Sequence, residues 1–252
     1  MDLLSNRVKR SEIVAGDHIY SWRASFIYSH HGIYIDDSLV IHFTAPPGKL
    51  TDSTNDSFCS SSGPTSSSFP GHSSSSSAPG GQQKTCPHQR QRCGSRKPGS
   101  GVAICCLDCF IKKGSLYRFE YGVTKKHFRF QLRGGTCTTA ESDPQSSVVQ
   151  RANYLFENGF GIYHLFRNNC EDFAIYCKTG ILTMDEKWPG RSGQIASLVK
   201  MFPEMGAKYF SSTKEAVKER IRKYGTDIGV RDDVIKVPVE DMDSFHRGLM
   251  PA

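Results

Sequence analysis

The sequence FRNNCEDF, residues 166–173, decides how this chain is organised. It has the features of a helix that begins at a cysteine. Asn168 and Asn169 are both good N-cap residues, because a side-chain amide oxygen can accept from the free N–H groups of the first turn. Two acidic residues follow Cys170, apolar residues continue at helical spacing, and Gly180 is typical of a helix end. The helix dipole favours the thiolate form of such a cysteine, although the acidic neighbours oppose it, so Cys170 is a candidate nucleophile.

The composition limits the class of protein. The chain has 252 residues, nine cysteines and a formal net charge of +7, and only 37% of its residues are apolar. Its first residues lack the apolar segment of a secretory signal, and no run approaches the length of a membrane span. We therefore expect free thiols and a cytoplasmic location, with peripheral membrane contact permitted by the positive charge. The basic residues are dispersed and no nucleic-acid-binding module is present, so no nucleic-acid partner is expected.

An early pair of strands predicts a β-hairpin. Residues 29–35 and 39–44 are rich in branched and aromatic side chains and flank an Asp-rich turn. Side chains alternate along a strand, which places His31 on an apolar face and His30 on the opposite face. In the second strand His42 also leaves the apolar side. Neighbouring strands can therefore bring His30 and His42 together, whereas His31 is expected to be structural.

The remaining pattern predicts further strands and one long helix. Short runs of branched and aromatic residues predict strands at residues 18–23, 102–107, 115–121, 127–132, 161–166 and 234–237. A helix is predicted to start with Asp143 as N-cap and Pro144 in its first turn, and to end at Gly159. Together these elements predict an α+β fold, with an antiparallel sheet against which the helix that begins at Cys170 packs.

Two regions differ from this pattern. Residues 50–84 are rich in Ser, Gly and Pro and cannot bury enough apolar surface to offset chain entropy, so we expect a disordered insertion. Residues 183–252 form a C-terminal extension in which residues 208–222 predict a basic amphipathic helix. That helix could lie on an anionic membrane, or it could pack on the domain as a solvated helix, and its narrow apolar stripe favours the second. With an N-terminal arm at residues 1–12, one domain remains at residues 13–182.

The hairpin and the helix start together resemble a known family. The features concerned are HHGIYI at residues 30–35, His42 twelve residues after His30, and NCEDF at residues 169–173. They resemble the lecithin retinol acyltransferase (LRAT) domain family, which includes the HRAS-like suppressor phospholipase/acyltransferases. That family belongs to the wider NlpC/P60-like, circularly permuted papain-like group.

Other segments resemble the plant members of this family, the NC domain-containing proteins, more closely. These segments are GDHIY at residues 16–20, LYRFEYG at residues 116–122 and the helix region from Asn168 to Gly180. Two positions depart from the family pattern: His31 stands where an aromatic residue is usual, and Asp172 stands where animal members commonly have His. These departures bear on the substrate more than on the fold.

The resemblance implies a permuted papain-like domain with a three-residue catalytic site. In family terms Cys170 is the nucleophile, His30 the general base and His42 its orienting partner. The implied reaction is acyl transfer: the Cys170 thiolate attacks a lipid acyl ester and forms an acyl-thioester, and His30 then activates an alcohol, an amine or water. The expected partner is therefore a lipid acyl substrate, and no cofactor is expected.

Two other functions remain open. The chain could be a non-catalytic interaction protein that keeps the LRAT-like fold, acting in stress or membrane-linked signalling. It could also be a thiol peptidase or amidase, as the NlpC/P60-like relatives imply.

A second group of cysteines raises a metal-binding hypothesis. The candidate zinc ligands are Cys86, Cys93, Cys106 and Cys109, with Cys105 and His88 as spare candidates. Cys106 and Cys109 have the C-x-x-C spacing of a zinc half-site. Six residues separate Cys86 from Cys93, which is longer than the usual knuckle. Ordinary reduced thiols are the alternative interpretation.

Overall fold

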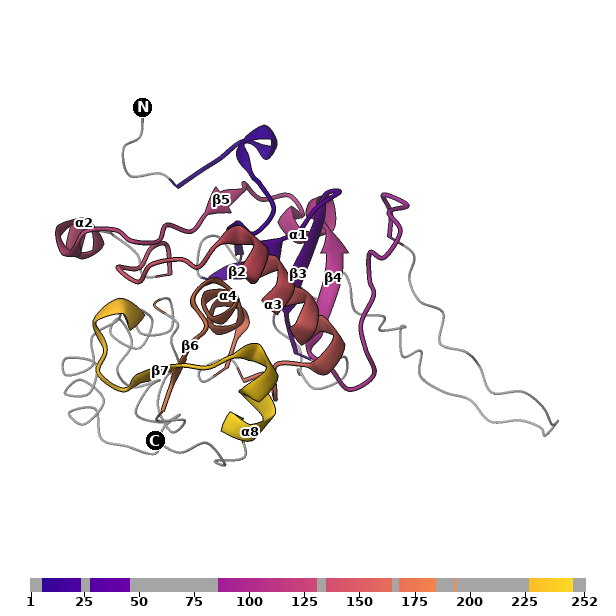
Figure 1. Cartoon of the computed structure of the whole chain (residues 1–252). Helices are drawn as coiled ribbons and strands as arrows, with labels where there is room; N and C mark the ends of the chain where they lie inside the picture. Colours follow the sequence, from indigo (N-terminus) through magenta and orange to yellow (C-terminus); the bar gives the residue numbers. More distant parts are fainter. Residues whose placement is uncertain are drawn as a thin grey trace, which may run out of the picture.

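A five-stranded antiparallel sheet lies at the centre of the computed structural model, with strand order β4-β3-β2-β1-β5 (Figure 1). The structure describes residues 6–23, 28–45, 86–130, 135–164, 168–184, 193 and 227–246. The strands of this sheet are β1 (His18–Arg23), β2 (Tyr28–Tyr34), β3 (Leu39–Phe43), β4 (Val102–Cys106) and β5 (Tyr117–Arg118). A second, two-stranded sheet pairs β6 (Ile181–Thr183) with β7 (Val234–Lys236).

Helices cover both faces of the larger sheet. The α-helices are α1 (Leu107–Ile111), α2 (Lys125–Phe130), α3 (Gln145–Asn158), α4 (Cys170–Thr179) and α8 (Met242–His246). Within the described residues, short 3₁₀ helices span Arg10–Glu12, Ile228–Val230 and Val239–Asp241. Figure 1 shows α3 and α4 side by side on one face of the sheet, in agreement with their mutual contacts.

The predicted hairpin is confirmed as β2 and β3. Their register pairs Gly32 with His42. In the turn, Asp37 and Ser38 both have positive φ, 43° and 64°. Two such residues are typical of the tight turns whose twist matches that of the flanking strands. The turn therefore fixes which side chains of the two strands lie opposite one another.

The two faces of the sheet are distinguished by the aromatic residues that cover them. Phe43 contacts Phe173 of α4, with ring centroids 6.2 Å apart. On the other face, a Cβ added to Gly32 would lie 3.0 Å from the ring of Phe110 in α1 and 2.7 Å from Val40. A glycine is thus needed there to let α1 approach the sheet. We call these the α4 face and the α1 face.

Helix α4 begins and ends as the sequence predicts. The Asn169 side chain is the N-cap and accepts from the backbone N–H groups of Glu171, at 2.8 Å, and Asp172, at 3.3 Å. The Asp172 carboxylate accepts from the Asn169 N–H at 3.0 Å, which completes a capping box. At the other end Gly180 adopts the left-handed conformation, with φ 67°. Every residue of α4 is buried, so these caps set the position of Cys170.

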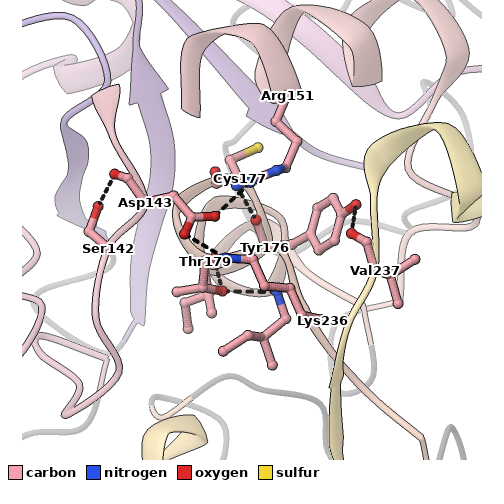
Figure 2. A network of polar contacts seen from close by, with 10 residues as sticks. Ser142, Asp143, Arg151, Tyr176, Cys177, Thr179, Lys236 and Val237 are labelled. Carbon is pink, nitrogen blue, oxygen red and sulfur yellow. Dashed lines mark hydrogen bonds and ion pairs between the residues drawn. The ribbon is translucent and has the colours of Figure 1, made fainter. Parts of the chain in front are cut away.

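A polar network holds the C-terminal segment against α3 and α4 (Figure 2). The Asp143 carboxylate accepts from Arg151 and from Lys236, each at 2.6 Å. Arg151 also donates to the Cys177 carbonyl in the last turn of α4, at 2.5 Å. Asp143 therefore joins three elements of the chain. The prediction that its side chain caps α3 is wrong, because Pro144 occupies the N-cap position and no side-chain cap is present.

Three predicted strands differ from the structure. The strand predicted at residues 127–132 is wrong: Lys125–Phe130 forms α2, which buries none of its side chains and leaves Phe130 68% exposed. The strand predicted at residues 115–121 shortens to β5, which pairs with Ile19 and Tyr20 of β1 and forms an isolated bridge with Arg7. In the described part of residues 161–166, His164 forms an isolated bridge in place of the predicted strand.

Some predictions fall outside the described residues. These are the disordered insertion at residues 50–84 and the basic helix at residues 208–222. The strand predicted at residues 234–237 is confirmed as β7. None of the helices in the described part of the chain has the length and apolar character needed to cross a membrane.

Candidate functional site

Two of the three predicted site residues are in direct contact. The Nε2 atom of His30 lies 2.9 Å from Nδ1 of His42, and the two rings meet edge to face. The contact follows from the sheet: His42 pairs with Gly32, so His30 is a diagonal neighbour on the same face. Strand alternation in the sequence predicts this juxtaposition.

Phe110 of α1 forms a wall beside the imidazole pair. Its ring centroid lies 5.3 Å from that of His30 and 6.1 Å from that of His42. The Arg23 guanidinium donates to the Phe110 carbonyl and so ties this part of α1 to β1. Phe110 could not be identified from the sequence, because nothing in the pattern indicates a short helix directly after β4.

The imidazole of His30 is neutral at physiological pH. Burial lowers its pKa well below the usual value, and the charge of Arg23, followed by His31 and Lys112, lowers it further. A neutral imidazole can accept a proton, so His30 is in the protonation state that a general base requires.

Cys170 lies at the start of α4, buried, with 5% of its surface exposed. Its thiol donates to the carbonyl of Ser29, with Sγ and O 3.8 Å apart. Ser29 directly precedes His30, so the sulfur reaches the strand that carries the predicted base. The β2–β3 ladder extends only from Gly32 to Tyr34, which places the Ser29 carbonyl beyond its end.

The thiol and the imidazole pair approach β2 from different sides. Helix α4 covers one face of the sheet, whereas His30 and His42 point toward Phe110 on the α1 face. The hydrogen bond to the Ser29 carbonyl brings the sulfur to the main chain of β2. The structure therefore brings Cys170 to the main chain next to His30, while the two imidazoles bond to each other.

A second imidazole network occupies the α4 face. It is a chain of hydrogen bonds from Tyr121 to His18, from His18 to His31 and from His31 to Ser29, with lengths of 2.8, 2.8 and 2.7 Å. Burial lowers the pKa of His31 to about 3 and also lowers that of His18 well below the usual range. His31 is thus a buried, neutral residue, in keeping with the structural role predicted for it. The network was missed because the register of β1 against β2 cannot be read from the sequence.

The four predicted zinc ligands also converge. The Sγ atoms of Cys86, Cys93, Cys106 and Cys109 all lie within 4.8 Å of one another. The spare candidates, Cys105 and His88, are not part of this group. These side chains are the described residues best suited to hold a metal ion.

Comparisons with known proteins show which family the chain belongs to. The chain matches the family model described as lecithin retinol acyltransferase over residues 11–183, which include Cys170 and the imidazole pair. It is 42% identical over 253 aligned positions to Protein LEAD-SENSITIVE 1 of Arabidopsis thaliana, covering 96% of this chain and 90% of that protein. No solved structure matches it significantly. The chain therefore belongs to the lecithin retinol acyltransferase family.

Proposed function

We propose that this chain is a thiol acyltransferase or acyl hydrolase that acts on lipid acyl esters through Cys170. The observation that carries the proposal is the position of a buried thiol at a capped helix start, bonded to the residue before a neutral, partnered imidazole. Family membership supports acyl transfer or hydrolysis as the class of reaction. From the resemblance to the family pattern, we infer that Cys170 is the nucleophile, His30 the base and His42 the orienting residue.

The hydrogen bond within the imidazole pair supports the role of His30 as base. If Nε2–H of His30 donates to Nδ1 of His42, then Nδ1 of His30 carries the lone pair. Nδ1 is also the ring nitrogen closer to the main chain, where the sulfur contacts Ser29. Catalytic hydrogen bonds often tighten only when substrate binds.

The proposed reaction has two steps. In the first, His30 takes the thiol proton, the Cys170 sulfur bonds to the acyl carbon, the ester C–O bond breaks and the alcohol leaves with the proton. In the second, an alcohol, an amine or water gives a proton to His30 and attacks the thioester, which releases the thiol. Backbone N–H groups at the start of α4 would stabilise the oxyanion. His42 would orient His30 and stabilise its charged form.

The proposed arrangement of the domain is that of a circularly permuted papain-like fold. It is supported by the order of the site residues, with both imidazoles on an early hairpin and the cysteine on a later helix that packs against it. The lipid substrate implies contact with a membrane surface. The basic helix predicted at residues 208–222 would serve that contact and stays a prediction.

The proposal is tested by incubating the full chain with phosphatidylcholine vesicles and measuring released lysophospholipid and fatty acid. We expect turnover by the wild type, none by Cys170→Ala, and a loss of about 10²–10⁴-fold for His30→Gln, the range for a general base. Cys177→Ala is the matched control, because Cys177 is a second buried cysteine of the same helix. Wild-type rates in Cys170→Ala would refute the proposal.

A non-catalytic binding role is the second candidate. It is favoured by the main-chain partner of the thiol and by the direction of the imidazole pair toward the α1 face. This role predicts that vesicles bind the wild type and Cys170→Ala equally, without turnover by either. The same incubation, followed by flotation of the vesicles, separates the two functions.

A further inference from the structure

Four cysteine side chains meet beside α1, apart from the sulfur of Cys170. Cys106 and Cys109 are buried at the end of β4 and in α1, and Cys86 and Cys93 are half-buried in the preceding loop. We propose that Cys86, Cys93, Cys106 and Cys109 bind one zinc ion as four thiolates. This inference does not depend on the proposed acyl transfer.

The spacing of the sulfur atoms fits tetrahedral zinc. With Zn–S bonds of about 2.3 Å, the sulfur atoms of a tetrahedral site are about 3.8 Å apart. Cys86 Sγ lies 3.7 Å from Cys106 Sγ and 3.7 Å from Cys109 Sγ. All pairs are within 4.8 Å, so a shift of a few tenths of an ångström to about 1 Å would close the site around the ion.

The loop before β4 explains how an unusual spacing can supply two ligands. Gln89 and Arg92 adopt positive φ, 50° and 63°, and so fold the loop back on itself between Cys86 and Cys93. Just after Cys93, the Gly94 N–H donates to the Ile104 carbonyl at 2.9 Å, which fastens the loop to β4. The six residues between the two cysteines therefore bring Cys93 Sγ close to Cys86 Sγ.

Backbone N–H groups are directed at two of the sulfur atoms. The Cys106 N–H donates to Cys93 Sγ at 3.1 Å, and the Cys109 N–H donates to Cys106 Sγ at 3.4 Å. Hydrogen bonds from amides stabilise negative charge on sulfur and fix the orientation of the ligands, as outer-shell groups do in metal sites. Unrelated reduced thiols, which are weak donors and acceptors, have no comparable reason to converge.

The proposed site would carry negative charge. Four thiolates and a divalent ion carry two net negative charges, and their four protons leave to solvent. Arg10 forms an ion pair with Asp108, which lies between the two ligands of the C-x-x-C pair. The charge of Arg10 thus balances that of Asp108 beside the ligands.

The proposed ion would hold α1 in place. Cys109 directly precedes Phe110, whose ring forms the wall beside His30 and His42. Helix α1 has only five residues and could not be stable on its own. A metal that joins α1 to the loop before β4 would fix the position of the Phe110 ring. It would in this way connect the loop that carries Cys86 and Cys93 to the surroundings of His30 and His42.

The first test needs no variant. Full-length chain purified under reducing conditions without chelator should contain about one zinc ion per molecule by elemental analysis. Metal-free protein given Co²⁺ should show the intense absorption of a tetrahedral cobalt–thiolate centre, with an end point at one equivalent. Folded wild type that retains no zinc after reconstitution would overturn the proposal, and so would iron in place of zinc or two disulfide bonds among these cysteines.

The second test assigns the ligands. Cys93→Ala and Cys109→Ala should lose most of the bound zinc, whereas Cys105→Ala should keep it, because Cys105 is buried next to Cys106 but is not in the group. If a variant fails to fold, alkylation of the wild type tests the ligand assignment instead. Bound zinc should protect these four thiols from alkylation until a chelator removes the ion. Full zinc content in folded Cys93→Ala and Cys109→Ala, or equal alkylation with and without the ion, would contradict the assignment.

Discussion

Replacing Asp143 with Ala should destabilise the chain by removing the carboxylate that joins Arg151 of α3 to Lys236 of β7. Its two ionic partners differ in burial: the Arg151 side chain is 12% exposed and that of Lys236 is 62% exposed. A buried hydrogen bond to a charged group contributes about 1.5–3 kcal/mol, and an exposed ion pair contributes about 0–1 kcal/mol. We therefore expect Asp143→Ala to lower the free energy of unfolding by about 2–3 kcal/mol, or Tm by about 4–12 °C for a chain of this size.

The matched control is Lys236→Ala, which removes only the exposed partner of Asp143. It should cost less than about 1 kcal/mol, because solvent screens that ion pair. Urea unfolding followed by circular dichroism at neutral pH measures both variants. The reasoning is refuted if Asp143→Ala is as stable as the wild type, or if Lys236→Ala costs as much as Asp143→Ala.

The same carboxylate predicts a dependence on pH. Burial acts to raise the pKa of Asp143, but hydrogen bonds from Lys236 and Arg151 outweigh burial and hold the pKa below its usual value. A carboxyl whose folded-state pKa is lowered stabilises the fold above its unfolded pKa of about 3.9, and this contribution is lost as pH falls through the folded value. The stability difference between wild type and Asp143→Ala should therefore be constant from neutral pH down to about 5 and should shrink at lower pH.

Two further predictions concern the candidate site. Asn169→Ala should lower the free energy of unfolding by about 1–2 kcal/mol, because the N-cap of α4 loses its acceptor, while Asn169→Asp keeps an acceptor and most of the stability; equal urea midpoints for Asn169→Ala and wild type would contradict this. The proposed base must be neutral, and burial is the largest cause of the low pKa of His30. The acid limb of kcat/KM should therefore lie below about pH 6.5, the usual value for histidine, and a limb above that value would exclude His30 as the base.

The sequence predicts most of the hairpin and of α4, because their signals are local. Asn169 and Gly180 adopt the cap conformations that their types favour, and the alternation of β2 and β3 places His30 beside His42. The contact between the imidazoles follows from the alternation of side chains along each strand and from the pairing of β2 with β3. Neither feature requires knowledge of the rest of the fold.

The wrong predictions arise where an alternating pattern has no buried face. Phe128 and Phe130 alternate with charged residues as in a strand, but α2 buries none of its side chains, and the Thr124 hydroxyl accepts from the His127 N–H near its start.

Asp143 precedes a helix as a cap would, yet its carboxylate is bonded to Arg151 and to a residue from the C-terminal segment. That residue, Lys236, lies 93 positions further along the chain, so no local sequence pattern could indicate the contact.

The side from which Cys170 meets β2 could not be predicted either. Strand parity separates His30 from His31, but only the packing of Phe173 on Phe43 shows which of these faces α4 covers. The convergence of the four other cysteines is also a tertiary feature, because the loop between Cys86 and Cys93 folds back through residues with positive φ that are not glycine.

The most direct measurement of the central claim is the mass of the intact chain after brief exposure to phospholipid and rapid acid quenching. A nucleophilic Cys170 predicts a mass increase equal to one acyl group, located on the peptide that contains Cys170 and removed by hydroxylamine, as a thioester is. The adduct should be absent from Cys170→Ala and present on Cys177→Ala. An unmodified Cys170 in wild type that turns over lipid, or an acyl group on another residue, would contradict the account.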